Sequence, residues 1–267
     1  MGLYKDYLNF AINIAKNAGK IQNSYFGNIS SLKTKSSNID LLTIADIESE
    51  KYLVKKIESI YPNHSILSEE IGSLNKSSDF TWVIDPLDGT TNFAHNLPIF
   101  SVSIALKKID EVICGVVYNP AADKCFYAEK NNGAFLNNLP ISCTKTLNLS
   151  ESLLATGFPY NHDERYDLSF DIFKNFYDIS RGIRRLGAAS LDLCFVAMGR
   201  FDGFYEFELK PWDICAGALI ASEAGANVTD WDNSKFPQDG SRILATNGFI
   251  HEEMVNTLTN KNYKLFF

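Results

Sequence analysis

Two carboxylates that directly follow an apolar strand place the strongest constraint on this chain. The segment from residue 82 to residue 92 reads WVIDPLDGTTN. A strand formed by its apolar start delivers Asp85 at its end, and Pro86, whose φ is fixed, bends the chain. That turn can bring Asp85 and Asp88 towards one point, where two negative charges repel each other unless a cation lies between them. The segment therefore predicts a strand that ends in a cation site.

The residue types around this turn indicate which ligands it would hold. Oxygen ligands favour a hard ion, and Mg²⁺ suits a site that water and a substrate phosphate complete. Gly89 permits close approach of the backbone, and Thr90 and Thr91 can open a helix whose N–H groups and dipole attract an anion. An ordinary surface turn is the alternative, because Asp, Pro and Gly are turn formers. The apolar strand before the turn argues against it, and a metal site beside a phosphate cradle is typical of phosphoryl transfer.

Acidic residues elsewhere could complete this site, although each has a simpler interpretation. Glu69 and Glu70 follow a predicted strand, where adjacent carboxylates can also form a solvated loop. Asp213 follows a Pro-Trp pair at the start of an apolar helix, where an Asp can cap the helix or stabilise its dipole. Asp46 ends a T-x-x-D pattern that reads as a capping box, and Lys35 lies in a polar loop. The residues alone leave both interpretations open at these positions.

Composition argues against several other classes of protein. The 267 residues carry a formal net charge of −7, and a surface with this charge repels nucleic acid. Three arginines, Arg181, Arg184 and Arg185, lie close together in the sequence and suggest a solvated strand edge or a subunit contact. No apolar run approaches the roughly 18 residues that span a bilayer. The first 26 residues resemble neither a signal nor a transit peptide, so we expect a cytoplasmic location. Five cysteines without CxxC and four scattered histidines argue against disulfides and a zinc site.

Hydrophobic periodicity predicts an α+β first half and an α/β second half. Helices are expected at 3–25, 44–60, 165–179, 188–198, 211–224 and 251–258. Strands are expected at 65–68, 81–84, 102–106, 112–118, 124–129, 153–156, 182–185, 203–206 and 242–245. Asparagine-rich turns are expected at 131–133 and 137–138. We predict two subdomains, 1–145 with most of the metal ligands and 146–267 with Asp213 and the substrate contacts.

Taken together, these motifs resemble the inositol monophosphatase family. The resemblance rests on residues 82–92, on the Glu-Glu pair at 69–70 and on the run WDICAG at 212–217. It extends from about Tyr7 to His251, and the segments at 35–37, 40–43, 133–135 and 222–226 follow in the family's order. It implies a layered α-β-α-β-α sandwich of the inositol monophosphatase and fructose-1,6-bisphosphatase type.

The resemblance also implies a role for each acidic candidate. The ligands of two to three Mg²⁺ ions would be Glu69, Asp85, the Leu87 carbonyl, Asp88 and Asp213. Thr90 and Glu69 would position the attacking water, and Asp46 would hydrogen-bond to Thr90. Glu70 and Lys35 would support these residues from behind. The implied reaction is direct displacement by water, which needs no general acid from histidine.

On the substrate side the resemblance implies hydrolysis of a small phosphate monoester, most simply myo-inositol 1-phosphate. The matched substrate-binding positions are Gly89, Thr90, Thr91, Ala189, Glu206 and Asp213. Lys210 occupies a place that varies in the family and would favour a substrate with extra negative charge. The segment 161–180 matches no motif. A lithium-sensitive homodimer without nucleic-acid or membrane partners is the corresponding expectation.

Several other activities remain open. Fructose-1,6-bisphosphatase and histidinol-phosphatase activities use similar scaffolds, whereas 3′-phosphoadenosine 5′-phosphate phosphatases usually carry Lys-Glu where this chain has Thr91 and Asn92. Phosphatases with an aspartyl nucleophile use D-x-D-x-T, and the spacing from Asp85 through Asp88 to Thr90 is one residue longer. A non-catalytic sugar-phosphate-binding regulator should have lost at least one metal ligand, and none is missing.

Overall fold

The structure is a computed structural model that describes residues 2–28, 32–34, 41–159, 161, 163–260, 263 and 266. Lys35, which the family resemblance places behind the site, lies outside these residues. The helices are α1 (Lys5–Tyr25), α2 (Ile44–Ile60), α3 (Thr90–Ala94), α4 (Glu164–Ile179), α5 (Ala189–Ala197), α6 (Pro211–Glu223) and α7 (His251–Leu258), with one 3₁₀ turn at Leu149–Glu151. Within the described ranges, every helix is too short or too polar to span a lipid bilayer.

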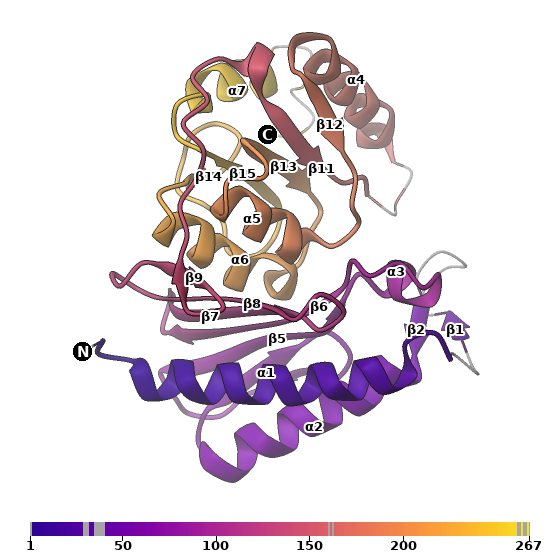
Figure 1. Cartoon of the computed structure of the whole chain (residues 1–267), viewed down its shortest axis with the longest axis vertical. Helices are drawn as coiled ribbons and strands as arrows, with labels where there is room; N and C mark the ends of the chain where they lie inside the picture. Colours follow the sequence, from indigo (N-terminus) through magenta and orange to yellow (C-terminus); the bar gives the residue numbers. More distant parts are fainter. Residues whose placement is uncertain are drawn as a thin grey trace.

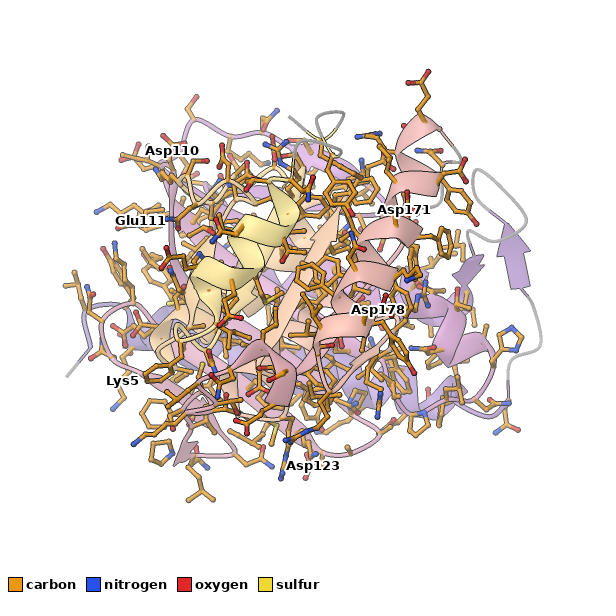
Figure 2. The ribbon with its side chains drawn as sticks, turned by 90° about the horizontal axis from the view of Figure 1, so that it is seen from above. Lys5, Asp110, Glu111, Asp123, Asp171 and Asp178 are labelled. Carbon is orange, nitrogen blue, oxygen red and sulfur yellow. The ribbon has the colours of Figure 1, made fainter. Side chains whose placement is uncertain are left out.

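The elements stack in five layers, which confirms the expected α-β-α-β-α sandwich (Figure 1). Helices α1 and α2 form the first layer and cover an eight-stranded sheet of order β10-β9-β8-β7-β6-β5-β3-β4. Helices α5 and α6 separate this sheet from a five-stranded sheet of order β12-β11-β13-β15-β14. Seen from above, α4 and α7 form the last layer, over the second sheet (Figure 2).

The first sheet is built largely from antiparallel neighbours, and the second is mixed. The first contains β3 (Ser65–Ser68), β4 (Gly72–Leu74), β5 (Phe80–Asp88), β6 (Ser101–Lys108), β7 (Glu111–Asn119), β8 (Lys124–Glu129), β9 (Ala134–Leu136) and β10 (Leu139–Pro140). The second contains β11 (Leu153–Thr156), β12 (Gly182–Arg184), β13 (Gly203–Phe207), β14 (Asn227–Thr229) and β15 (Arg242–Thr246). A small pair, β1 (Leu32–Thr34) and β2 (Leu41–Thr43), completes the strands of the described chain. The division into two subdomains at 145/146 stays a prediction.

The predicted long elements are confirmed within a few residues, whereas the shortest strands escaped the sequence pattern. Strands β4, β9, β10 and β14 have two or three residues, too few to show an alternation of apolar and polar positions. Strand β5 runs four residues further than the expected 81–84, because it keeps pairing with β6 beyond an irregularity. The turns at 131–133 and 137–138 are confirmed, with positive φ at Asn131, Gly133, Asn137 and Asn138.

Both faces of the first sheet are buried, which explains the unbroken apolar start of β5. Trp82 and Ile84 point into the core shared with α1 and α2, while Val83 points into the core shared with α5 and α6. Alternate side chains of a strand face opposite sides, so a strand covered by helices on both sides needs apolar residues at every position.

Helix α6 approaches the first sheet very closely, because Gly115 of β7 has no side chain. A Cβ atom at Gly115 would lie 2.8 Å from the carbonyl oxygen of Ala216 on α6. Helices α5 and α6 meet in the same way, since a Cβ atom at Gly217 would lie 2.8 Å from side-chain atoms of Leu193. These contacts determine how far α6, which begins near Asp213, stands from the end of β5.

We expect Gly115→Ala to lower the free energy of unfolding by about 1–3 kcal/mol, because the added methyl group meets a helix backbone that cannot rotate away. Chemical denaturation of the purified variant measures this change. Leu139→Ala is the control: Leu139 is 70% exposed on the edge strand β10, and its loss should change stability by about 0.5 kcal/mol at most. Wild-type stability of Gly115→Ala would show that α6 can move off the sheet without cost.

Candidate active site

A β-bulge brings Asp85 and Asp88 to the same face of the first sheet. Asp85 pairs with Ser103 of β6 and Asp88 pairs with Ser101, so three steps along β5 oppose two steps along β6. In a regular strand, residues three apart point to opposite faces, and the extra residue of a bulge reverses this. Pro86 lies in the irregular stretch, where its missing N–H leaves no ladder bond unmade. The predicted convergence of the two carboxylates is therefore present, and its cause is the bulge.

Immediately after β5, the chain turns through Gly89 into α3, as predicted. Gly89 has φ of +89°, and a Cβ atom there would lie 2.9 Å from the carbonyl oxygen of Ile99. Only glycine fits this position without strain. Helix α3 begins at Thr90, so the first N–H groups of α3 open towards the cavity described below.

Asp46 both caps α2 and holds Thr90. Its Oδ2 accepts hydrogen bonds from the backbone N of Thr43 (2.8 Å) and from the Thr43 hydroxyl (2.5 Å), which completes the predicted capping box. The Thr90 hydroxyl lies 3.0 Å from Asp46 Oδ1 and 3.0 Å from the Leu87 carbonyl oxygen, and can donate to either. Because the hydroxyl hydrogen is used in this way, the lone pairs of Thr90 remain available as acceptors.

Asp213 likewise has a structural bond in addition to its place in the cavity. Its Oδ2 accepts a hydrogen bond from the backbone N of Lys210 (2.7 Å), just before the first turn of α6. The Ser103 hydroxyl donates to the Trp212 carbonyl (3.0 Å), which ties the start of α6 to β6 beside Asp85. The capping interpretation of Asp213 is thus correct without excluding a functional role.

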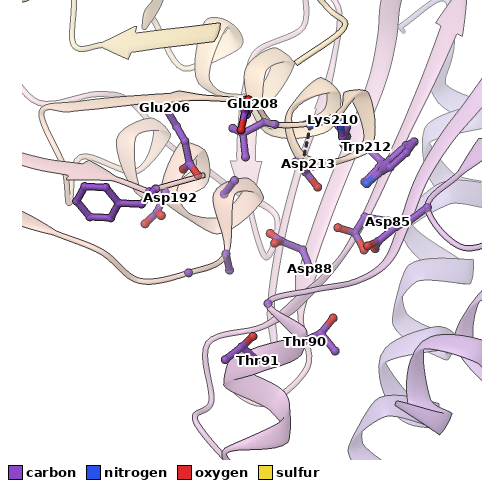
Figure 3. A pocket seen from close by; sticks show the side chains of 18 of the residues that line it. Asp85, Asp88, Thr90, Thr91, Asp192, Glu206, Glu208, Lys210, Trp212 and Asp213 are labelled. Carbon is purple, nitrogen blue, oxygen red and sulfur yellow. Dashed lines mark hydrogen bonds between the residues drawn. The ribbon is translucent and has the colours of Figure 1, made fainter. Parts of the chain in front are cut away.

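One cavity of about 370 Å³ collects almost all of the predicted site residues (Figure 3). It is lined by Glu69, Glu70, Asp85, Leu87, Asp88, Gly89, Thr90, Thr91, Ala189, Glu206, Lys210 and Asp213. Asp46 stands behind Thr90 and is fully buried. The carboxylates of Asp85, Asp88 and Asp213 face a common space, with Thr90 and Thr91 to one side of it (Figure 3).

Burial and mutual repulsion make these carboxylates hard to ionise in the absence of a cation. Burial, followed by the charges of Glu69, Asp88 and Asp213, raises the pKa of Asp85 well above its usual value. Burial and the charge of Asp88 do the same to Asp213. Burial raises the pKa of Asp88 to about 6, although hydrogen bonds from Ser190 oppose the shift. Such a set of acidic oxygens is a strong acceptor of positive charge.

The donor set fits a hard divalent cation that also binds a substrate. Among the described residues, no group of three or more His, Cys, Asp or Glu side chains is close enough together to hold a metal ion by itself. Mg²⁺ does not need such a group, because it usually takes one or two carboxylates and completes its shell with water and substrate phosphate. Each of the three carboxylates is oriented by a hydrogen bond from a backbone N–H. The Leu87 N–H donates to Asp85 (2.9 Å), and backbone N–H groups likewise donate to Asp88 and Asp213. Each of these bonds involves one oxygen of its carboxylate.

Two supporting residues were missed by sequence reasoning. Ser190 holds Asp88, because its backbone N (2.9 Å) and its hydroxyl (2.5 Å) both donate to Asp88 Oδ2. Asn92 donates to the carbonyl oxygens of Ile99 (2.8 Å) and Leu186 (2.7 Å), which fastens the segment before α5 to α3. A lone Ser in an apolar helix carries no sequence signal for such a role.

Helix α4, which lies in the segment that matched no motif, contacts residues in the wall of the cavity. Arg165 of α4 makes an ion pair with Glu208, and its guanidinium lies 5.5 Å from the centre of the Phe207 ring. Glu208 lines the cavity and has φ of +61°, a left-handed conformation that is unusual outside glycine. Phe158, also in the cavity wall, stacks on Phe170 of α4 with ring centres 4.5 Å apart.

Comparison with known proteins agrees with this geometry. The sequence profile of the inositol monophosphatase family matches residues 3–263. An inositol-1-monophosphatase of Synechocystis sp. is 41% identical over 253 residues, which are 94% of this chain and 88% of that protein. A putative Nus factor SuhB of Neisseria meningitidis serogroup B is 40% identical over 255 residues, which are 95% of this chain and 98% of that protein.

Solved structures show the same relationship. The extragenic suppressor protein SuhB of Bartonella henselae superposes with a TM-score of 0.91 at 34% identity, covering 96% of this chain and 99% of that one. An inositol monophosphatase of Anabaena superposes with a TM-score of 0.85 at 39% identity, covering 95% of each chain. The chain therefore belongs to the inositol monophosphatase family.

Proposed function

We propose that this protein is a Mg²⁺-dependent phosphatase that hydrolyses small polyol phosphate monoesters, with myo-inositol 1-phosphate as the simplest substrate. The observation that carries the proposal is the meeting, in one cavity, of the acidic residues Glu69, Asp85, Asp88 and Asp213 with the start of α3 at Thr90. Family membership supports the phosphatase class, and the similarity to the inositol-1-monophosphatase of Synechocystis supports the substrate. A cytoplasmic, lithium-sensitive homodimer belongs to the same proposal.

In this proposal the chain divides the work between its acidic and its hydroxyl-bearing residues. The ions would be held by Glu69, Asp85, the Leu87 carbonyl, Asp88 and Asp213. Bound Mg²⁺ would polarise the phosphoryl oxygens and neutralise the charge that develops on the leaving oxygen. Gly89 and Thr91 would hold the phosphate with N–H and hydroxyl groups. Glu70 would support the site from behind Glu69.

The attacking water would be oriented by Thr90 and Glu69. The Thr90 hydroxyl hydrogen is directed towards Asp46 or the Leu87 carbonyl, so the oxygen of Thr90 accepts a hydrogen bond from water. The Glu69 carboxylate accepts the other proton of that water. A water fixed by two acceptors points its lone pair in one direction, which is the condition for an in-line attack.

The names of other relatives suggest a second class of role. The Neisseria meningitidis protein is named a putative Nus factor, and relatives in Pasteurella multocida and Haemophilus influenzae are named Nus factor SuhB. A protein with only a binding role would have no need of the catalytic carboxylates, and Asp85 and Asp88 are present, buried and held by specific hydrogen bonds. Fructose 1,6-bisphosphate and histidinol phosphate remain the alternative substrates, and a phosphate-release panel that includes inositol 1-phosphate distinguishes them.

We expect Asp88→Asn and Asp213→Asn each to reduce kcat by at least about 10²-fold, because each removes negative charge at the point where the cations and the phosphate meet. The assay is Mg²⁺-dependent release of phosphate from inositol 1-phosphate and from p-nitrophenyl phosphate. Both variants should fold, because loss of a buried charge relieves repulsion. Asp171→Asn, an exposed change on α4 (Figure 2), is the control for charge alone. Near-normal activity would remove the residue concerned from the site.

Ser190→Ala should raise the Mg²⁺ concentration for half-maximal activity by about tenfold, because residues that orient a metal ligand contribute strongly to metal affinity. The variant loses the hydroxyl that donates to Asp88 Oδ2, while the backbone donor remains. Ser59→Ala, which removes an exposed hydroxyl of α2, should leave the Mg²⁺ dependence unchanged. An unaltered Mg²⁺ titration in Ser190→Ala would show that Asp88 does not depend on this bond.

The hydrolysis should invert the configuration at phosphorus. Carboxylates that ligate a cation have their lone pairs committed, so Asp85 and Asp88 are poor nucleophiles and a single displacement by water follows. The measurement uses a substrate made chiral at phosphorus with oxygen isotopes and sulfur, hydrolysed in labelled water. Retention, or an acyl phosphate trapped on either Asp, would replace this mechanism with a two-step route.

A further inference from the structure

One buried carboxylate in the cavity wall has no part in the proposed reaction. Asp192 of α5 is 1% exposed and lines the cavity. Its Oδ1 makes no hydrogen bond in the described structure. The buried neighbours Leu191, Leu193 and Val196 make α5 a largely apolar helix, in which Ser190 is the other polar residue. A buried acceptor without a partner destabilises a fold, so its position calls for a ligand or a structural reason.

A structural reason based on the helix dipole accounts for only part of the observation. Asp192 lies in the first turn of α5, where a negative charge is stabilised by the N-terminal end of the dipole. An exposed carboxylate would gain the same stabilisation without losing its hydration. The dipole therefore explains why an acidic residue is tolerated here, but it does not explain why the carboxylate is buried at the cavity.

Glu206 of β13 is a second buried carboxylate beside Asp192, and both can accept hydrogen bonds. Both lie on one side of the cavity, across Asp88 and Asp213 from Asp85 (Figure 3). Burial, then the charges of Glu206 and Asp88, raise the pKa of Asp192, so the two carboxylates are close enough to repel each other. Arg185 favours the charged form of both, yet no ion pair joins it to either in the described chain.

The absence of a side chain at Gly157 leaves room for the Glu206 carboxylate. A Cβ atom at Gly157 would lie 2.0 Å from Glu206 Oε1, so any side chain there would displace the Glu206 carboxylate. Both Gly157 and Glu206 line the cavity. The wall at this end is therefore shaped to present carboxylate oxygens, whereas the end around Thr90 presents N–H and hydroxyl groups.

We infer that Asp192 is a further substrate-binding residue: beside Glu206, which the family resemblance already assigns to the substrate, it binds an adjacent hydroxyl group of the polyol and disfavours a second phosphate at that end of the cavity. This assignment rests on the proposed phosphatase function, which places the phosphate at Asp88 and Thr90. Two neighbouring carboxyl groups offer several acceptor oxygens, which match the donors of a vicinal diol. The same oxygens repel a phosphate dianion, so a bisphosphate should be the poorer substrate.

The central experiment is Asp192→Asn, assayed with inositol 1-phosphate, fructose 1,6-bisphosphate and p-nitrophenyl phosphate. We expect KM for inositol 1-phosphate to rise at least about tenfold with kcat nearly unchanged, the size expected for a lost charge-assisted hydrogen bond. Kinetics with p-nitrophenyl phosphate, which has no hydroxyl groups, should stay within about twofold of wild type. The kcat/KM for the bisphosphate, relative to inositol 1-phosphate, should rise at least about tenfold.

Gly157→Ala provides a test that leaves every charge in place. It should raise KM for inositol 1-phosphate but not for p-nitrophenyl phosphate, because the added methyl group displaces the Glu206 carboxylate. Asp171→Asn is the matched control for the loss of one carboxylate outside the cavity. Thermal unfolding of each variant verifies that it is folded. If Asp192→Asn does not fold, Asp192→Glu replaces it, because this change keeps the charge but moves the carboxylate and should likewise raise KM for inositol 1-phosphate.

Failure of the proposed function and failure of the inference give different results. If wild-type protein with Mg²⁺ does not hydrolyse p-nitrophenyl phosphate, the proposed function fails. If it does, the inference is overturned by an unchanged KM for inositol 1-phosphate in Asp192→Asn, or by an equal loss on all three substrates, which indicates a structural role. Equal wild-type kcat/KM for cyclohexyl phosphate and inositol 1-phosphate would also overturn it, since the former lacks the hydroxyl groups.

Discussion

Repulsion between buried carboxylates is the constraint on which the rest of this structure depends. Asp85, Asp88 and Asp213 share one cavity with Glu69, and burial adds to their mutual repulsion. Such an arrangement forms only if strong local structure keeps the side chains from turning away. The bulge in β5, with Pro86 in its irregular stretch, supplies that structure for the first two residues. Their placement follows from backbone geometry, and the role left for a cation would be to neutralise their negative charge.

The middle helical layer supplies the remaining half of the site. Asp213 comes from α6, more than a hundred residues after β5, so its position depends on how closely α6 packs on the first sheet. Gly115 and Gly217 permit that close approach, and the bond from Ser103 to the Trp212 carbonyl aligns the start of the helix with β6. Small residues in the core therefore determine the geometry of the charged site, although they carry no charge themselves.

Sequence reasoning succeeded where a residue has a local cause and failed where the cause is tertiary. The long helices and strands, the capping box ending at Asp46 and the turn at Gly89 all follow from patterns within a few residues. The prediction that Asp213 and Asp85 belong to one site came from the family resemblance, because no local pattern connects residues so far apart in the sequence. Ser190 and Asp192 could not be found at all, since a polar residue in an apolar helix becomes informative only when its neighbours in space are known.

The chemistry of the cavity changes from one end to the other, and this polarity connects the fold to substrate choice. Around Thr90, a helix start and several acidic side chains would suit a phosphate with its counter-ions. Around Glu206, the second sheet and α5 contribute acceptor oxygens that suit hydroxyl groups. The two ends belong to different sheets, which the middle helices hold together. In the proposed phosphatase, the relative position of the sheets would therefore set the distance between the phosphate ester bond and the hydroxyl groups that are recognised, so substitutions between the sheets should influence specificity as well as stability.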